Sequence, residues 1–401
     1  MRRSTDRILT THAGSLPRTP ELIAANAARE ADPENTQGFN TLLSEAVADL
    51  VRRQQKLGID IPNDGEYGHA MSSAVDYGAW WSYSFARLGG LSLGEVGLWE
   101  MESRRSSPGN VVLSSFGDRR DRQLFNEAYS DPDSGITTGK QKHFPKVTGK
   151  LEYTGQAAVA EDIANLKAGL DSAGLSEGFL ASLSPGSCSR IANEYYATEE
   201  EFIYACADVM REEYKAIVDA GLVVQIDDPS IAENWDQINP EPSVEDYLRF
   251  TQIRVEALNY ALRGLPEEQI RFHLCWGSWH GPHTTDIEFR HLADTLLKIN
   301  AGAYSFEAGN VRHEHEWRVW EDTKLPEGKL IIPGVVSHAT NVVEHPELVA
   351  DRIERFARLV GRENVIASTD CGLGGRVHPQ IAVAKLEALG EGARLASNRL
   401  W

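Results

Sequence analysis

The amino-acid sequence predicts an α/β fold, a (β/α)8 TIM barrel made of one domain with a large insertion. Short apolar runs alternate with amphipathic helical segments along most of the chain, which is the pattern of α/β domains. Polar side chains of ligand type follow many of these runs, where such barrels carry their chemistry. No glycine-rich dinucleotide or phosphate loop follows the first run, which disfavours the competing doubly wound sheet.

Nine segments are predicted as strands from their apolar, β-branched composition. They are residues 7–11, 59–62, 147–153, 179–183, 223–226, 270–276, 303–306, 330–336 and 365–368. An eightfold barrel uses eight of them. One strand therefore lies outside the ring or pairs in a hairpin, and the sequence alone does not say which.

Helices are predicted between the strands from an apolar period of 3.6 residues and from end signals. Thr19–Pro20 supplies an N-cap followed by proline at the first helical turn. Gly58 ends the next helix, which begins near Thr41. The remaining predicted helices are residues 158–174, 199–220, 244–262, 285–299 and 346–360.

The alternation fails between residues 71 and 146. This stretch contains Trp80, Trp81 and Trp99 together with glycine, serine and charges of both signs. We interpret it as an insertion within a single domain of residues 1–401, serving as a lid over the site or as a contact between subunits of a homo-oligomer. A helical subdomain packed for stability alone is the alternative.

Composition limits the class of protein. The chain of 401 residues has a formal net charge of −19 and no concentrated basic tract, which argues against nucleic acid and anionic membranes as partners. Its N-terminus lacks the apolar core of a signal peptide, and no run approaches the length of a membrane span. The four cysteines are widely spaced and do not form a disulfide framework. We therefore expect a cytoplasmic protein.

The run Arg271–Trp276 contains a histidine and a cysteine one residue apart. Alternate residues of a strand share a face, so His273 and Cys275 are expected to point to the same side. An imidazole and a thiolate that converge suit zinc. The simpler interpretation is a buried strand with an incidental cysteine. Two further residues at predicted strand ends, Glu307 and Cys371, favour a metal site.

Taken together, the motifs resemble the cobalamin-independent methionine synthase family, specifically its zinc-bearing C-terminal barrel. The matching stretches occur in the same order along nearly the whole chain. The chain is similar to the short, single-barrel branch of the family, which also includes epoxyalkane:coenzyme M transferase. The matching stretches are Thr11–Pro17, Asp64–Glu66, Gln225–Pro229, His273–Cys275, Phe306–Glu307, Val336–His338 and Thr369–Leu373.

This resemblance implies a zinc-dependent methyltransferase that activates a thiol acceptor, most simply homocysteine, toward an alkyl donor. It implies that zinc is held by four side chains: His273, Cys275, Glu307 and Cys371. The substrate carboxylate would be held by Ser15 and its neighbouring backbone, and the amine by Glu66 and Asp227. His338 would move a proton.

The chain departs from the family in two places. The segment that holds a pterin in the folate enzymes is Ser184–Arg190 here, with no aromatic residue close by. Arg18 replaces a neutral residue and is expected either to meet a carboxylate or sulfonate of the substrate or to lie on the surface. Two alternatives stay open: epoxide opening or thioether cleavage with coenzyme M, and a barrel that binds zinc without turnover.

Overall fold

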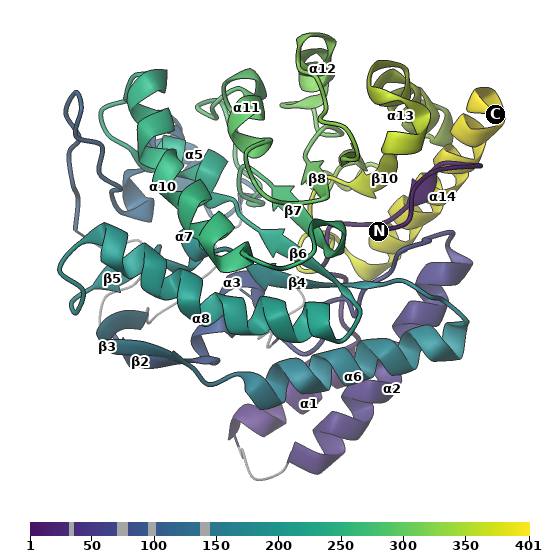
Figure 1. Ribbon diagram of the computed structural model, residues 1–401, viewed down its shortest axis with the longest axis horizontal. Helices are drawn as coiled ribbons and strands as arrows, with labels where there is room; N and C mark the ends of the chain where they lie inside the picture. The colour runs from purple at the N-terminus through teal and green to yellow at the C-terminus, as the bar shows by residue number, and fades with distance from the viewer. Residues whose placement is uncertain (32–35, 70–78, 95–101, 137–144) are drawn as a thin grey trace.

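A curled parallel sheet of seven strands forms the centre of the computed structural model, which describes residues 1–31, 36–69, 79–94, 102–136 and 145–401 (Figure 1). The strands lie in the order β1-β10-β9-β8-β7-β6-β4. All neighbouring pairs are parallel, so the α/β class is as predicted. The bounds are β1 (Leu9–Thr10), β4 (Phe179–Leu183), β6 (Val223–Asp227), β7 (Ile270–Leu274), β8 (Ala303–Phe306), β9 (Leu330–Val336) and β10 (Ile366–Thr369).

The segment of residues 59–63 lies between the two edge strands of this sheet. The backbone N–H groups of Asp60 and Ile61 donate to the Thr10 carbonyl at 3.0 and 3.1 Å, and Asn63 forms a single parallel bridge with Phe179. The strand predicted at residues 59–62 is therefore not a regular strand. Pro62 has no N–H to donate to a ladder, which limits the pairing to isolated contacts.

A second, three-stranded sheet lies apart from the first and contains β2 (Leu88–Leu93), β3 (Pro145–Tyr153) and β5 (Ala192–Asn193) (Figure 1). Strand β3 pairs antiparallel with β2 and parallel with β5. The predicted strand at residues 147–153 thus belongs to this second sheet and not to the main one. Its partner β2 contains two consecutive glycines, Gly89 and Gly90, which weaken the sequence signal for a strand.

Helices cover the outer face of the main sheet. Four of the five predicted after residue 150 match closely or fully: α6 (Gln156–Ala173), α8 (Glu199–Asp219), α10 (Val244–Leu262) and α13 (Pro346–Val360). Their starts have physical causes, since Thr198 caps α8 by accepting from the Glu201 N–H and Ser243 caps α10 in the same way. The other helices are α1 (Pro20–Ala31), α2 (Thr36–Lys56), α3 (Ala79–Phe85), α4 (Arg120–Leu124), α5 (Asn126–Ser130), α7 (Pro185–Cys188), α9 (Ser230–Glu233), α11 (Ala293–Leu296), α12 (Val319–Asp322) and α14 (Pro379–Leu400).

The helix predicted at residues 285–299 is wrong. The structure has only a 3-10 turn, Phe289–His291, and the single turn α11. Residues of this stretch are instead hydrogen-bonded to side chains from distant segments. The Thr285 hydroxyl donates to Asp236, and the Phe289 N–H donates to Glu316 at 2.6 Å. Tertiary hydrogen bonds here override the local helical pattern.

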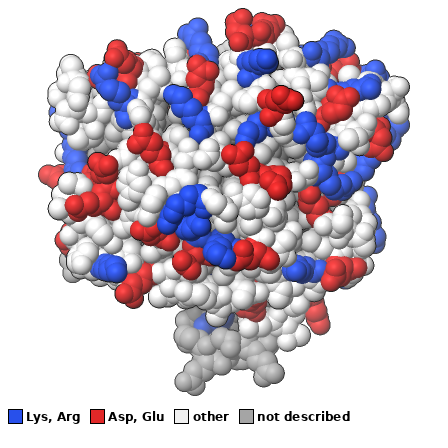
Figure 2. Space-filling model, in the orientation of Figure 1, with Lys and Arg blue, Asp and Glu red and all other residues white. Residues whose placement is uncertain are grey.

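The terminal helix α14, which is absent from the helices predicted above, packs against α13 and beside the N-terminal segment (Figure 1). Ser397 accepts a hydrogen bond from the Ile8 N–H at 3.0 Å. Acidic and basic side chains are interspersed over the face drawn in Figure 2. Among the described residues, no helix has the length and apolar character needed to cross a membrane.

Candidate metal centre and substrate cavity

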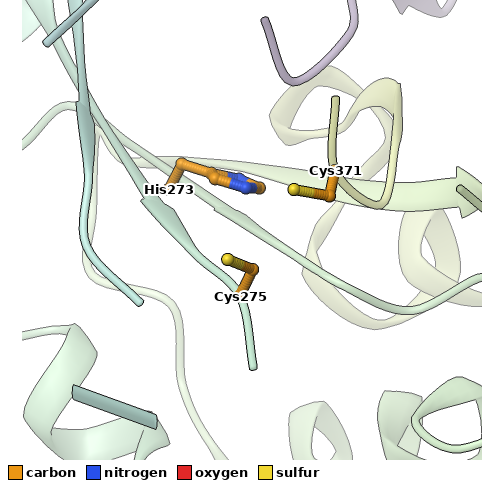
Figure 3. Close-up of side chains that lie close together, drawn as sticks. All are labelled: His273, Cys275 and Cys371. Carbon is orange, nitrogen blue, oxygen red and sulfur yellow. The ribbon is translucent and has the colours of Figure 1, made fainter. Parts of the chain in front are cut away.

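Three soft ligand side chains converge at the carboxyl ends of two strands. His273 belongs to β7, Cys275 follows that strand directly, and Cys371 follows β10. One ligand atom from each lies within 4.8 Å of the other two, and their side chains point toward one another (Figure 3). Both cysteines are free thiols.

The His273 ring is oriented for a metal. Its Nδ1 is hydrogen-bonded to the Ser305 hydroxyl at 3.0 Å, whereas its Nε2 is buried without a hydrogen-bond partner among the described residues. A partner that fixes one ring nitrogen and leaves the other toward the ligand cluster is the usual support of a metal-binding histidine. One imidazole nitrogen and two sulfurs suit a borderline-soft ion such as zinc. The residues therefore fit a metal.

The two thiols differ in acidity. The contact with the Cys275 thiol lowers the pKa of Cys371 well below its ordinary value, and the proximity of the His273 ring acts in the same direction. The same Cys275–Cys371 contact, together with burial, raises the pKa of Cys275 well above its ordinary value. Cys371 is thus the more acidic thiol of the pair.

Glu307 lies next to this cluster but not within it. Its carboxylate accepts hydrogen bonds from the Trp276 N–H at 3.0 Å and from the Asn310 amide at 2.7 Å. It groups instead with His338 and Asp370, again with ligand atoms within 4.8 Å of one another. Burial and the charge of Asp370 raise the pKa of Glu307 well above its ordinary value. Its role as a fourth metal ligand stays a prediction.

The cysteine–histidine cluster opens into a cavity with about 50 Å³ of free space. Three of the predicted substrate-binding residues, Ser15, Glu66 and Asp227, line it together with His273, Cys275 and Cys371. The structure thus brings together residues that are far apart in the sequence, such as Ser15 and Cys371, which are separated by 356 positions.

Two buried carboxylates, Glu66 and Asp227, lie in this cavity. Burial and then the charge of Glu66 raise the pKa of Asp227 well above its ordinary value. Asp227 accepts a hydrogen bond from the Gln225 amide at 2.7 Å, while the donors of the nearby Arg271 go to Gln225, Thr11 and His12. No salt bridge of Asp227 with an arginine occurs among the described residues. Two carboxylates that repel each other in a buried site favour binding a cation between them.

Ser15 is packed tightly against the loop that carries Cys371. The Ser15 carbonyl accepts from the N–H groups of Leu373 and Gly374, both at 2.9 Å. A Cβ added to Gly374 would lie 2.4 Å from the Ser15 hydroxyl oxygen, so only glycine permits this approach. The contact ties the first loop of the chain to the metal-binding loop.

Arg18 neither lines the cavity nor lies on the surface, contrary to both expectations from the sequence. It is buried, and its guanidinium donates to the backbone carbonyls of Glu66 and His69, the latter at 2.9 Å. The cation that lines the cavity is Arg376, whose Nε and Nη2 atoms donate to the Ser278 hydroxyl at 2.9 and 2.6 Å. Arg376 follows Cys371 in the loop after β10, and this position in the sequence was a signal that it could line the cavity.

Two further groups complete the surroundings. Trp80, from the stretch predicted to be an insertion, lines the cavity, and its neighbour Trp81 is buried and donates to the Ser187 carbonyl at 3.1 Å. His338 is buried close to Cys371. Burial lowers the pKa of His338 to about 3, so its imidazole is neutral at pH 7. Met71 and Trp99, also in the predicted insertion, lie outside the described residues.

Known proteins resemble this chain in sequence. A family model described as "cobalamin-independent synthase, catalytic domain" matches residues 126–394. A methionine synthase of Thermococcus kodakarensis is 23% identical over 393 residues, which cover 98% of this chain and 94% of the relative. A 2-hydroxypropyl-CoM lyase of Xanthobacter autotrophicus is 24% identical, covering 89% of this chain and 86% of the relative.

Solved structures share the fold. A B12-independent methionine synthase from Shewanella sp. W3-18-1, in complex with selenomethionine, superimposes with a TM-score of 0.69 at 21% identity and covers 98% of this chain and 99% of its own. The family match extends over more than half of the sequence and includes the strands that carry His273, Cys275 and Cys371. The chain therefore belongs to the cobalamin-independent methionine synthase family.

Proposed function

We propose that this protein is a zinc-dependent methyltransferase that forms methionine from homocysteine and a methyl donor. The observation that carries the proposal is one cavity that holds both a soft ligand cluster, His273, Cys275 and Cys371, and two buried carboxylates, Glu66 and Asp227. A ligand with a thiol at one end and an ammonium group at the other matches this pair of environments.

The metal would be held by His273, Cys275 and Cys371, with Glu307 as a fourth ligand. When bound, zinc stabilises the thiolate form of the substrate, which is otherwise a minor species at neutral pH. The Glu307 oxygens already have donors in Trp276 and Asn310, so this carboxylate can leave a metal without becoming an orphaned buried charge. Glu307 is thus the ligand suited to yield to the substrate sulfur.

The ammonium and carboxylate groups of the substrate would be bound by acidic and basic side chains of the cavity, respectively. Glu66 and Asp227 would receive the ammonium group. Ser15 would hold the carboxylate, as the resemblance implies, and Arg376 takes over the cationic role that the sequence suggested for Arg18. His338, neutral at pH 7, would accept and return a proton beside the reacting atoms.

At the level of the fold, we propose one (β/α)8 domain spanning residues 1–401. The segment of residues 59–63 would take the eighth position, because it is hydrogen-bonded to β1 and bridged to β4. The insertion of residues 71–146 would be a lid, an assignment supported by Trp80 on the cavity wall.

The experiment is isothermal titration calorimetry of the zinc-loaded protein with L-homocysteine and with coenzyme M. Coenzyme M has a thiol but no amine, so we expect homocysteine to bind more tightly. Asp227→Asn should weaken homocysteine binding by roughly 1.5–3 kcal/mol, the range for a hydrogen bond to a charged group, and should leave coenzyme M binding unchanged. Tighter binding of coenzyme M by the unmodified protein would favour the lyase-like chemistry instead.

A further inference from the structure

A second, smaller cavity lies behind Glu66. It holds about 10 Å³ of free space, enough for a single water molecule. Of the residues that the structure describes, Glu66 alone lines both this chamber and the substrate cavity. The chamber walls include His69, Asp64, Arg87, Asp162 and Glu213. Glu66, the predicted amine-binding carboxylate, therefore lies between the substrate cavity and this chamber.

Two buried polar atoms in this region lack a hydrogen-bond partner among the described residues. They are Oε2 of Glu66 and Nδ1 of His69, and they lie 3.8 Å apart. This distance is too long for a direct hydrogen bond, but a water molecule can bridge two such atoms. An unbridged pair would leave two buried polar groups unsatisfied, at a substantial cost in stability.

The geometry of both residues is fixed by their surroundings. Glu66 has a φ of 58°, which is unusual for a residue with a side chain, and Arg18 holds the carbonyls on either side of the turn. The His69 ring stacks on Tyr83 with a centroid distance of 3.9 Å and an interplanar angle of 1°. The Tyr83 hydroxyl in turn donates to Glu213 at 3.0 Å.

Arg87 is the cation of the chamber, and it is committed to other carboxylates. Its guanidinium pairs with Asp162 and with Glu213, the latter at 2.9 Å. Glu213 also accepts from the hydroxyls of Tyr153 and Ser182. Arg87 is therefore engaged by these two carboxylates and not by Glu66.

We propose that the chamber binds one water molecule that bridges Glu66 and His69, and that His69 is thereby a positioning residue for recognition of the substrate ammonium group. The role of the ammonium group rests on the proposed function, whereas the water site does not. His69 would hold the carboxylate toward the substrate cavity, so it would affect ligands with an amine and leave similar ligands without one unaffected.

The water site is tested by a crystal structure of the unmodified protein without substrate. We expect an ordered water within hydrogen-bond distance of Glu66 Oε2 and His69 Nδ1. A dry chamber, or a direct Glu66–His69 hydrogen bond, would overturn the proposal whatever reaction the protein catalyses.

The positioning role is tested by calorimetry of the zinc-loaded protein with L-methionine and with 4-(methylthio)butanoate, its analogue without the amine. His69→Phe keeps a ring to stack on Tyr83 but has no nitrogen, and we expect about tenfold weaker binding of methionine with unchanged binding of the analogue. His69→Asn, which restores a polar nitrogen, should recover part of the loss.

The outcomes separate the two proposals. Equal effects of His69→Phe on both ligands, or no effect on either, would refute the positioning role of His69. If the unmodified protein does not prefer methionine over the analogue, the proposed amine recognition is itself wrong, and the positioning role falls with it while the water site is still decided by the crystal structure. Thermal melting followed by circular dichroism checks that each variant is folded.

Discussion

At the scale of single residues, the candidate metal site is defined by two free thiols and by one imidazole nitrogen that is unpartnered within the part of the chain that the structure describes. His273 Nε2 has no partner among the described residues, and its ring is held by Ser305. The two thiols are in contact and face the same point. One nitrogen and two sulfurs that face a common point suit a metal such as zinc.

Replacing Cys275 by alanine should therefore remove the metal but not the fold. We expect at least about a 100-fold loss of zinc affinity, since even outer partners of metal ligands are worth 10–100-fold. Zinc content is measured by inductively coupled plasma mass spectrometry and folding by circular dichroism. Cys206→Ala, at a buried site on α8, is the control that should keep zinc. Unfolding of the Cys275 variant would instead mark the metal as structural.

Replacing His338 by alanine should slow turnover without weakening binding. A group that moves a proton typically contributes about 10²–10⁴-fold to the rate, and His338 lies beside the cluster rather than within it. The measurement is kcat for methionine formation beside the Kd of homocysteine from calorimetry. His315→Ala, at an exposed histidine, should change neither quantity. An unchanged kcat in the His338 variant would contradict the proton-transfer role.

At the scale of elements, an ionic cluster fixes the loop that follows β7. His313 lies between Asp286 and Glu316, with ring nitrogens 3.1 and 2.8 Å from their carboxylates, and its ring stacks on Trp276. Burial opposes a charge on this ring, but the hydrogen bonds to Asp286 and Glu316 outweigh it and raise the pKa of His313 to about 10. The imidazolium thus joins the loop to the 3-10 segment Glu314–Arg318.

His313→Gln should destabilise the protein in a pH-dependent way. The folded pKa of about 10 lies above the unfolded value of 6.5, so the stabilisation is fully present below pH 6.5 and is lost as the pH rises through 10. We expect a loss of about 3–5 kcal/mol in the free energy of unfolding near pH 6, as for removal of one partner of a buried pair. The difference from the unmodified protein should shrink toward pH 10 in urea titrations. A difference that does not vary with pH would show that His313 is neutral in the fold.

At the scale of the whole molecule, one buried arginine ties distant parts of the curled sheet together. Arg271 of β7 donates to Gln225 of β6 at 2.7 Å, and to Thr11 and His12, just beyond β1, at 2.9 and 2.6 Å. Its guanidinium also lies 3.5 Å from the ring centroid of Phe179 on the other edge strand, β4. The side chain therefore spans the interior between the two edges of the sheet.

Arg271→Met should lower stability more than the loss of a surface arginine does. The change leaves three buried acceptors without their donor, and each costs about 1–3 kcal/mol. Arg7→Met is the matched control, because Arg7 pairs with Asp60 from a partly exposed position where ion pairs contribute at most about 1 kcal/mol. Urea titrations of both variants give the comparison. Equal effects would show that the Arg271 hydrogen bonds do not join the edges of the sheet.

The sequence by itself determined the elements whose signal is local. The α10 and α13 helices have their predicted bounds because apolar spacing and capping residues act within a few turns. His273 and Cys275 converge as predicted because alternate residues share a side of a strand, and Cys371 joins them because parallel strands end at a common edge.

Only the tertiary structure decided the features that depend on distant partners. Arg18 and Arg376 both lie in loops, and hydrogen bonds to the Glu66 and His69 carbonyls turn the first away from the cavity that the second lines. Strand β3 lies outside the main sheet, where it pairs with β2, a glycine-containing strand with little sequence signal. A local pattern can specify which backbone conformation a segment prefers. The direction of a long charged side chain, and the partner of a strand, are set by hydrogen bonds between segments far apart in the sequence.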